Sequence, residues 1–183
     1  LMPDVGYTRL DGAVAGERQA ALSAADMFLF PIDNIQETFG LAPVEAMAAG
    51  LPLVVSDWDG MKDTVSEDVG FRVPTRTLTG AHTVSDGYRY ATGLDGYQQF
   101  SARLSAMTQI DVPVLTKRIV ELAKDPALRR RMGEAGKARA RTMYDWAAVI
   151  PQMQDLWAEL AARRRAGRGQ VCFAGALPIF PSP

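Results

Sequence analysis

The sequence predicts an α/β fold with a partial, Rossmann-like parallel sheet, flanking helices and a helical C-terminus. Residues 27–30 and 53–56 form two short apolar runs with the length and composition of buried strands. An alanine-rich segment, residues 41–50, separates them and is long enough for a crossover helix. Residues 111–165 repeat apolar side chains at helical spacing. Strands that alternate with helices in this way are typical of a doubly wound parallel sheet.

The N-terminal part supplies the approach to this sheet. Residues 4–10 predict a short strand or the approach to one, and residues 17–25 predict an alanine-rich helix with Leu22 facing inward. The apolar run at 27–30 follows and ends at Pro31, which cannot donate to a strand ladder. We therefore expect the order strand, helix, strand, helix, strand in a parallel half-sheet.

The helix at 41–50 carries the clearest chemical signal. Pro43 falls in its first turn, where a missing amide hydrogen costs nothing, and Gly50 is a natural C-terminal stop. The first amides of a helix have no internal acceptor and suit a phosphate, and Gly40 allows close approach to the backbone. Glu37 and Glu45 lie eight positions apart around this helix start. Two carboxylates at that separation suit polyhydroxyl ligands such as sugars and ribose.

Residues 57–110, which follow the second strand, show weaker patterns. Residues 57–60 predict a turn, in which Trp58 is either a stacking surface or a local packing anchor. A short helix at 61–66 and a short strand at 70–73 follow. We interpret residues 74–110 as an insertion with one helix, residues 97–107, that shapes a substrate pocket or a subunit contact.

The helical C-terminal part has three predicted caps. Asp111, Asp125 and Asp145 each precede an apolar-periodic segment, as N-cap residues do. Pro151 should kink the last helix, which runs to about residue 165. Residues 166–183 show no period, and we expect a poorly ordered tail.

Two glycines fall within the predicted helix that begins after Asp125. Gly133 and Gly136 lower its intrinsic helix propensity, so a break there is an alternative to a continuous helix through Met143.

Composition indicates a single globular domain. The chain has 183 residues, is 48% hydrophobic and carries a net charge of −1. Residues 1–116 hold 7 basic and 15 acidic side chains, whereas residues 117–183 hold 13 basic and 6 acidic. Solvated basic helix faces explain this asymmetry more simply than an anionic partner or a membrane surface. With Cys172 as the single cysteine, an intrachain disulfide is impossible, which fits a reducing cytoplasm.

The run from Glu37 to Pro52, ETFGLAPVEAMAAGLP, resembles the E-x7-E signature of a large glycosyltransferase family. The family is the retaining glycosyltransferase family 4, or glycosyl transferases group 1, typified by sucrose synthases and bacterial mannosyltransferases. Asp57, Gly60 and Gly70 match its pattern further along the chain, and the resemblance implies that the turn near Asp57 and Gly60 lies close to the donor pocket. The resemblance is close over about residues 5–73 and looser over 111–160.

The resemblance implies a domain organisation. Family members of the GT-B fold have two Rossmann-like domains, and this chain is similar to the later part of the C-terminal, donor-binding one. Residues 1–73 would be an incomplete donor-binding core, 74–110 the insertion, 111–165 C-terminal helices of the same domain and 166–183 the tail. The family's diphosphate-neutralising arginine and lysine have no counterpart here. We therefore expect a fragment that is inactive without its N-terminal domain.

The resemblance also implies a site and a reaction. Glu45 would bind ribose hydroxyls, and Glu37 would act as the catalytic-site carboxylate on the donor sugar. The backbone amides of Phe39, Gly40 and Leu41 would contact donor sugar or phosphate. The reaction would be hexosyl transfer from a nucleotide-sugar donor, with retention at the anomeric carbon and no metal or other cofactor.

The expected partners are the donor, an acceptor glycan, lipid-linked or small-molecule acceptor, and the missing N-terminal domain, but no nucleic acid. The expected location is cytoplasmic, with peripheral contact at the inner face of a membrane as an alternative.

Three other functions are considered. A nucleotide-sugar epimerase shares the two-domain fold, but the ETFGL run argues against it. A non-catalytic nucleotide-binding or protein-interaction module derived from such a domain is the main alternative, although Glu37 and Glu45 are intact. A helical interaction module built from residues 111–165 is weaker still.

Overall fold

A computed structural model describes residues 4–14, 16–34 and 36–167 of the chain. The chain divides into two compact units, Leu1–Tyr144 and Asp145–Pro183. The predicted tail lies outside the described residues from position 168 onward, and so does Cys172. Ala166 ends the last helix instead of starting the tail.

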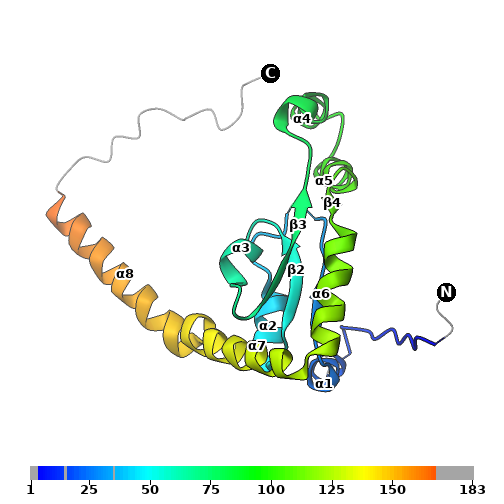
Figure 1. The fold of residues 1–183 in the computed structure, drawn as a ribbon. Coiled ribbons are helices and arrows are strands. Elements are labelled where there is room, and N and C mark those ends of the chain that lie inside the picture. The colour runs from blue at the N-terminus through cyan, green and yellow to red at the C-terminus, as the bar shows by residue number, and fades with distance from the viewer. Residues whose placement is uncertain (1–3, 15, 35, 168–183) are drawn as a thin grey trace. The chain divides into compact units, whose positions relative to one another are not determined.

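The first unit is built on a four-stranded sheet (Figure 1). Its strands β1 (Phe28–Phe30), β2 (Leu53–Asp57) and β3 (Gly70–Arg76) pair in parallel, and β4 (Gln109–Ile110) pairs antiparallel with β3. The predicted α/β fold with a partial parallel sheet and flanking helices is confirmed. β3 extends three residues beyond its predicted end, because Thr75 and Arg76 pair with β4.

The strand predicted at residues 4–10 is wrong. No strand forms there, and Val5 and Tyr7 are 62% and 86% exposed. A strand needs a neighbour to accept and donate its backbone hydrogen bonds. Among the described residues, β1 pairs with β2 alone, so residues 4–10 have no such neighbour.

The two faces of β2 divide the hydrophobic core. Leu53 and Val55 lie in one cluster with side chains of the helix that follows β1, whereas Val54 lies in a second cluster with Leu122 and Met132. Successive strand residues point to opposite faces, so one fully buried strand contributes to both clusters. This burial on both faces explains why residues 53–56 form a continuous apolar run.

Three helices precede β3. They are α1 (Glu17–Ala24), α2 (Leu41–Ala49) and α3 (Met61–Thr64). Leu22 of α1 packs against the first core cluster, as predicted. α2 ends at Gly50, which has φ of +85° and donates its amide to the carbonyls of Ala46 and Met47. This left-handed C-cap is the stop that the sequence predicted.

In the first unit, β4 is followed by the α-helices α6 (Val112–Lys124) and α7 (Pro126–Arg139). Both predicted caps are confirmed. Asp111 Oδ1 accepts from the amide of Val114 at 3.0 Å, and Asp125 Oδ1 accepts from the amide of Leu128 at 2.8 Å. A capping side chain of this kind stabilises a helix start by about 1 kcal/mol.

The glycines of α7 are contact positions, and the helix does not break at them. A Cβ atom on Gly133 would overlap the carbonyl oxygen of Gly50, and one on Gly136 would lie 3.4 Å from Cγ of Met47. α7 therefore packs backbone against backbone on the end of α2. It continues into a π-helical segment, η2 (Ala140–Tyr144), which also packs on α2.

The second unit contains the helix α8 (Trp146–Ala166). Asp145 caps it as predicted, because its Oδ1 accepts from the amide of Ala147 at 2.8 Å. The helix contains Pro151, and its two tryptophans, Trp146 and Trp157, are exposed. Of the helices in the described ranges, α8 included, none has the length and apolar character needed to cross a membrane.

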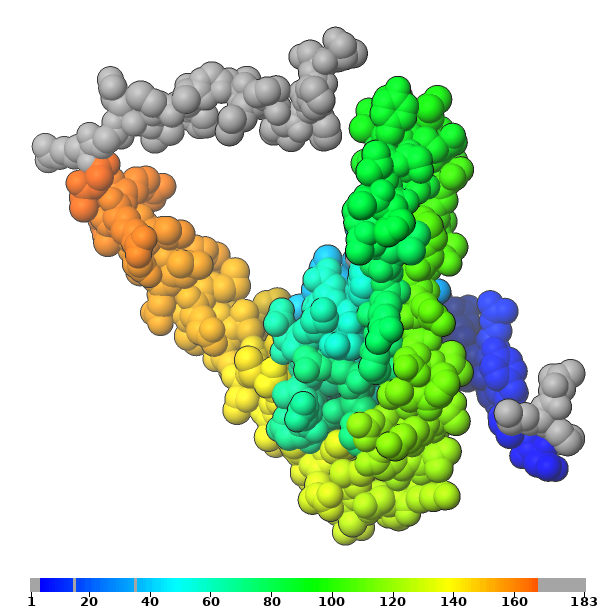
Figure 2. Space-filling view, turned by 45° about the horizontal axis from the view of Figure 1, so that its top comes forward, coloured from blue at the N-terminus to red at the C-terminus, as the bar shows by residue number. Residues whose placement is uncertain are grey.

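Residues 77–108 form a helical hairpin that stands away from the sheet (Figure 2, upper green region). It contains a 3₁₀ turn η1 (Gly80–His82), α4 (Val84–Ala91) and α5 (Tyr97–Ala106). The sequence predicted α5 but not α4, because α4 is only eight residues long and contains Gly87 and two tyrosines, all weak helix formers.

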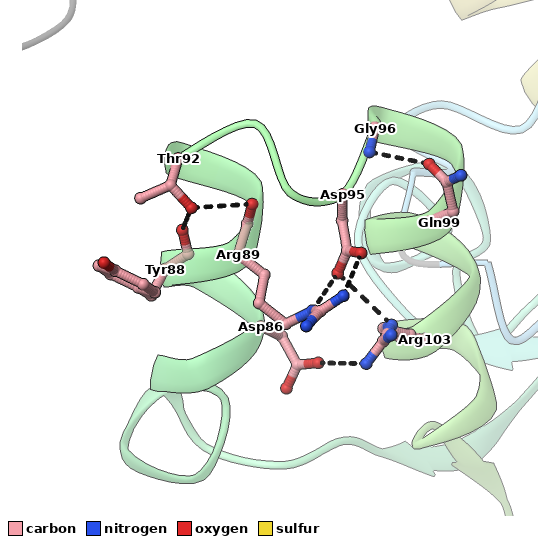
Figure 3. A network of polar contacts seen from close by, with 8 residues as sticks. All are labelled: Asp86, Tyr88, Arg89, Thr92, Asp95, Gly96, Gln99 and Arg103. Atoms are coloured by element: carbon pink, nitrogen blue, oxygen red, sulfur yellow. Dashed lines mark hydrogen bonds and ion pairs between the residues drawn. The ribbon is translucent and has the colours of Figure 1, made fainter. Parts of the chain in front are cut away.

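An ionic network joins the two helices of the hairpin (Figure 3). Asp95 accepts from Nε and Nη2 of Arg89, each at 2.8 Å, and lies 3.5 Å from Nε of Arg103. Arg103 also pairs with Asp86 at 3.7 Å. The Asp95 side chain is only 7% exposed. It is therefore the centre of the network, and its charge is balanced by two guanidinium groups.

Low pH should destabilise the hairpin of α4 and α5. The hydrogen bonds from Arg89 lower the pKa of Asp95 below its ordinary value of about 3.9. A carboxyl group with a lower pKa in the folded state stabilises that state above the ordinary pKa. The stabilisation is lost as the pH falls through the folded-state pKa. We expect amide-exchange protection of α4 and α5 to fall as the pH drops below about 4.

The Asp95→Asn variant isolates this effect. It should show weaker protection at neutral pH and little of the further acid-induced loss, because its side chain does not titrate. Asp68→Asn, at an exposed position, is the control and should behave as the parent chain does. Equal acid sensitivity in Asp95→Asn and the parent chain would assign the loss to another group.

Candidate functional site

The candidate site lies at the carboxyl ends of β1 and β2. The loop of residues 31–40 leaves β1 and leads into α2, and the turn of residues 58–60 leaves β2 and leads into α3. Ligands of open α/β sheets bind at this edge, outside the carboxyl ends of the strands. The topology therefore places the predicted residues where this fold binds ligands.

Contacts with β2 and with the turn that follows it fix the path of the loop. The Ser56 hydroxyl donates to the carbonyl of Ile32 at 2.6 Å, which ties the loop to the buried end of β2. Further along, a Cβ atom on Gly60 would overlap the carbonyl oxygen of Thr38. The turn predicted to lie near the site therefore touches the loop directly, and it needs a glycine to do so.

The last two loop residues are anchored by side chains from elsewhere in the chain. The Phe39 ring meets the Tyr144 ring edge to face, with centroids 5.8 Å apart. Gly40 has φ of +77°, and a Cβ atom there would lie 2.7 Å from the sulfur of Met61. Gly40 is thus required by its left-handed backbone and by the packing of Met61, independently of any ligand.

Glu37 is held by the start of α2. Its Oε1 accepts a hydrogen bond from the amide of Gly40 at 3.0 Å. Gly40 is the N-cap residue and provides no side chain to cap the helix. The carboxylate is half-buried, and no partner is recorded for its Oε2 within the described residues. One oxygen of Glu37 therefore fixes the loop, and the other is available to a ligand.

Two amides of the helix start remain open to a ligand. Within residues 4–14, 16–34 and 36–167, no acceptor is recorded for the amides of Leu41 and Ala42. The next residue, Pro43, has no amide hydrogen, and the amide of Val44 already donates to the carbonyl of Gly40. Unpaired amides at the positive end of a helix dipole favour an anion.

Glu45 lies in the second turn of α2. Its Oε1 is 3.5 Å from Nη2 of Arg18 on α1, and its side chain is 31% exposed. Helical side chains lean toward the N-terminus of their helix. Glu45 therefore leans toward the end of α2 at which Glu37 is held. The two glutamates predicted from the sequence flank the same helix.

Sequence reasoning missed the supporting residues. Arg18, Met61 and Tyr144 contact predicted site residues from other elements. None of them belongs to a recognisable local motif, because their roles depend on contacts between segments far apart in the chain. Only the placement of Gly60 near the site had a sequence signal, namely its match to the family pattern.

Replacing Gly60 by alanine should displace the loop. Gly60 has φ of −57°, which any residue adopts, so the effect is purely steric. We expect a loss of about 1–3 kcal/mol in the free energy of unfolding, as for other overpacked sites. Urea titration measures it. Gly87→Ala on α4 is the matched control, because nothing lies within 4 Å of its added Cβ, and it should be neutral or stabilising. Equal stability of Gly60→Ala and the parent chain would contradict the close approach of Thr38.

The residues that the structure describes contain no group of three or more histidine, cysteine, aspartate or glutamate side chains placed to hold a metal ion.

The chain has recognisable relatives. Residues 5–83 match the sequence profile of the family described as glycosyl transferases group 1. Over 152 residues the chain is 28% identical to the alpha-maltose-1-phosphate synthase of Mycobacterium tuberculosis, covering 83% of this chain and 32% of that protein. Over 146 residues it is 30% identical to the phosphatidyl-myo-inositol mannosyltransferase of Mycobacterium leprae, covering 79% of this chain and 29% of that one.

A solved structure also matches. It is the sucrose-phosphate synthase of Thermosynechococcus elongatus, with 27% identity and a TM-score of 0.44, covering 68% of this chain and 23% of the other. The chain spans about a third of the length of the curated relatives that it matches.

Proposed function

Residues 5–83 carry the sequence pattern of the glycosyl transferases of group 1, and from this relationship we propose that the protein transfers a sugar from a nucleotide-sugar donor to an acceptor. The resemblance seen in the run from Glu37 to Pro52 is confirmed by the match to this family. The chain is related to glycosyltransferases. The donor site, the retention of anomeric configuration and the role of each residue are our proposal.

One observation supports the donor site above all. The start of α2 combines the amides of Leu41 and Ala42, which have no acceptor among the described residues, with two carboxylates. Glu37 accepts from the Gly40 amide, and Glu45 lies in the second helical turn. A nucleotide sugar carries a diphosphate between two polyhydroxyl groups, the ribose and the sugar. Amides suit the diphosphate, and carboxylates suit the hydroxyl groups.

Each residue then has a distinct task. The amides of Leu41 and Ala42 bind the diphosphate, and the neighbouring backbone of Phe39 and Gly40 approaches the donor. Glu45 accepts from the ribose hydroxyls. Glu37 is fixed through Oε1, and it accepts from hydroxyls of the donor sugar through Oε2.

The transfer itself requires little covalent chemistry from these residues. The bond between the donor sugar and its diphosphate breaks, and the diphosphate keeps the electron pair. The sugar bonds to an acceptor hydroxyl oxygen, whose proton passes to the departing diphosphate. Helix-start amides stabilise the negative charge that develops on the diphosphate. Glu37 contributes by holding the sugar in a fixed orientation, which can supply a large part of a rate enhancement. We expect the reaction to proceed without a metal ion, with the nucleotide sugar as substrate.

Binding of nucleotides to the 183-residue chain tests the proposal. We expect one of UDP, GDP and ADP to raise the free energy of unfolding by about 2.7 kcal/mol at 100 times its Kd. Thermal or urea unfolding at a series of nucleotide concentrations measures this. Adenine, guanine and uracil alone serve as controls, because they lack the ribose and diphosphate that the site recognises. A chain that unfolds cooperatively but is stabilised by no nucleotide would argue against a donor site and in favour of a protein-interaction module.

A further inference from the structure

Arg18 lies beside one of the two proposed donor-binding carboxylates. It is the second residue of α1, and its Nη2 is 3.5 Å from Oε1 of Glu45. Among the ion pairs of the described residues, this is the one that includes Glu45. α1 and α2 are separate elements with β1 between them, so the tertiary fold creates the contact.

The placement of Arg18 is determined by the packing of α1. Leu22, one helical turn further along, packs against the first core cluster, and this fixes the face that α1 turns toward α2. The start of α1 is also tied down, because Glu17 Oε2 accepts from the amide of Asp11 at 2.8 Å. The Arg18 side chain itself is 68% exposed, so most of its donors face solvent.

The pair has consequences for the orientation of Glu45. A glutamate side chain samples several rotamers, and a carboxylate that must accept from two neighbouring hydroxyl groups has to adopt a particular one. A guanidinium group 3.5 Å from Oε1 reduces this freedom by ion pairing and leaves Oε2 for a ligand. Ordering a side chain before binding lowers the entropy that binding loses.

We propose that Arg18 is a positioning residue that orients Glu45 for the ribose of the donor nucleotide. The proposal rests on the proposed function, because Glu45 must be the ribose-binding carboxylate. Arg18 does not itself touch the nucleotide. Its effect therefore passes through Glu45 and concerns the ribose, not the diphosphate.

The exposure of the ion pair between Arg18 and Glu45 sets how much the loss of Arg18 should weaken nucleotide binding. Exposed ion pairs contribute about 0.2–1 kcal/mol, so Arg18→Gln should weaken nucleotide binding about 1.4- to 5-fold. Arg18→Lys keeps the charge and should restore part of the affinity. Gln19→Ala, at the next and exposed position of α1, is the matched control and should leave the affinity unchanged.

A double-mutant cycle on the 183-residue chain tests the coupling. Affinities for UDP, GDP and ADP are measured by calorimetry for Arg18→Gln, Glu45→Ala and the double variant. We expect Arg18→Gln to have no effect once Glu45 is alanine, and we expect Arg18→Gln to leave the affinity for inorganic pyrophosphate unchanged. Urea titration of each variant confirms that the changes are not losses of folding.

The possible results separate the two proposals. If Glu45→Ala leaves nucleotide affinity unchanged, the donor-site assignment fails, and the role of Arg18 fails with it. If Glu45→Ala weakens binding but the effect of Arg18→Gln persists in its background, Arg18 acts independently of Glu45. If Arg18→Gln weakens pyrophosphate binding as much as nucleotide binding, Arg18 contacts the diphosphate directly. Each of the last two results overturns the positioning role and leaves the donor site in place.

Discussion

Replacing Glu37 by alanine is expected to lower the turnover of sugar transfer by about 10²–10³-fold, the scale of lost positioning and electrostatic stabilisation in active sites. Two effects combine in this variant. The donor sugar loses the acceptor that orients it, and the Gly40 amide loses Oε1 of Glu37, its hydrogen-bond partner at 3.0 Å. The Michaelis constant for the donor should change less than turnover, because both effects concern the reacting end of the donor. The measurement is the rate of nucleotide release from the donor in the presence of acceptor, made on a protein that also contains the N-terminal domain that the chain is expected to need for activity.

Glu37→Gln separates these two effects. The glutamine carbonyl can still accept from the Gly40 amide, so the loop should keep its path and the chain its stability. Its amide group cannot act as a charged acceptor for sugar hydroxyls. We therefore expect most of the loss of turnover in Glu37→Gln with little change in the free energy of unfolding. Equal losses in turnover and donor affinity for Glu37→Ala would indicate uniform binding instead of a role in the transition state.

Replacing Glu45 by alanine is expected to weaken nucleotide binding about 10- to 150-fold, or roughly 1.5–3 kcal/mol, the contribution of hydrogen bonds to a charged group. Glu45 lies one turn inside α2 and pairs with Arg18. The loss should appear with nucleotides and not with inorganic pyrophosphate, because it concerns the ribose. Calorimetric titration of the 183-residue chain measures both affinities.

A control for Glu45 is available on another helix. Glu134 of α7 is also a glutamate in an ion pair, at 3.7 Å from Lys137, and its side chain is 71% exposed. Glu134→Ala removes a similar charge and pair away from the start of α2, and it should leave nucleotide affinity unchanged. Equal effects of Glu45→Ala and Glu134→Ala would reduce the role of Glu45 to one of overall charge.

The helix α2 shows how far local chemistry predicts this fold. Its start after Gly40, its proline in the first turn and its glycine stop were all predicted from residue types, and each is found in the structure. The caps at Asp111, Asp125 and Asp145 were predicted in the same way. These features depend on hydrogen bonds within a few residues, so the sequence contains all the information that they need.

Glycines show where such prediction fails. Gly133 and Gly136 weaken a helix by intrinsic propensity, and from sequence a break was a reasonable alternative. In the structure they are the positions at which α7 contacts Gly50 and Met47 of the neighbouring segment. A propensity describes an isolated helix and carries no information on what approaches it, so the reason for these glycines becomes visible only in the packed structure.

The sequence by itself therefore determined the type of sheet, the helix that carries the candidate site and the two glutamates that flank it. Periodicity, capping and a local motif depend only on residues that are close together in the chain, so the sequence alone is enough to predict them. Only the tertiary structure decided that Gly60 abuts Thr38, that Tyr144 anchors Phe39 and that Arg18 pairs with Glu45. These contacts join segments that are separated by whole elements, and they form because burying the two faces of β2 brings those elements together.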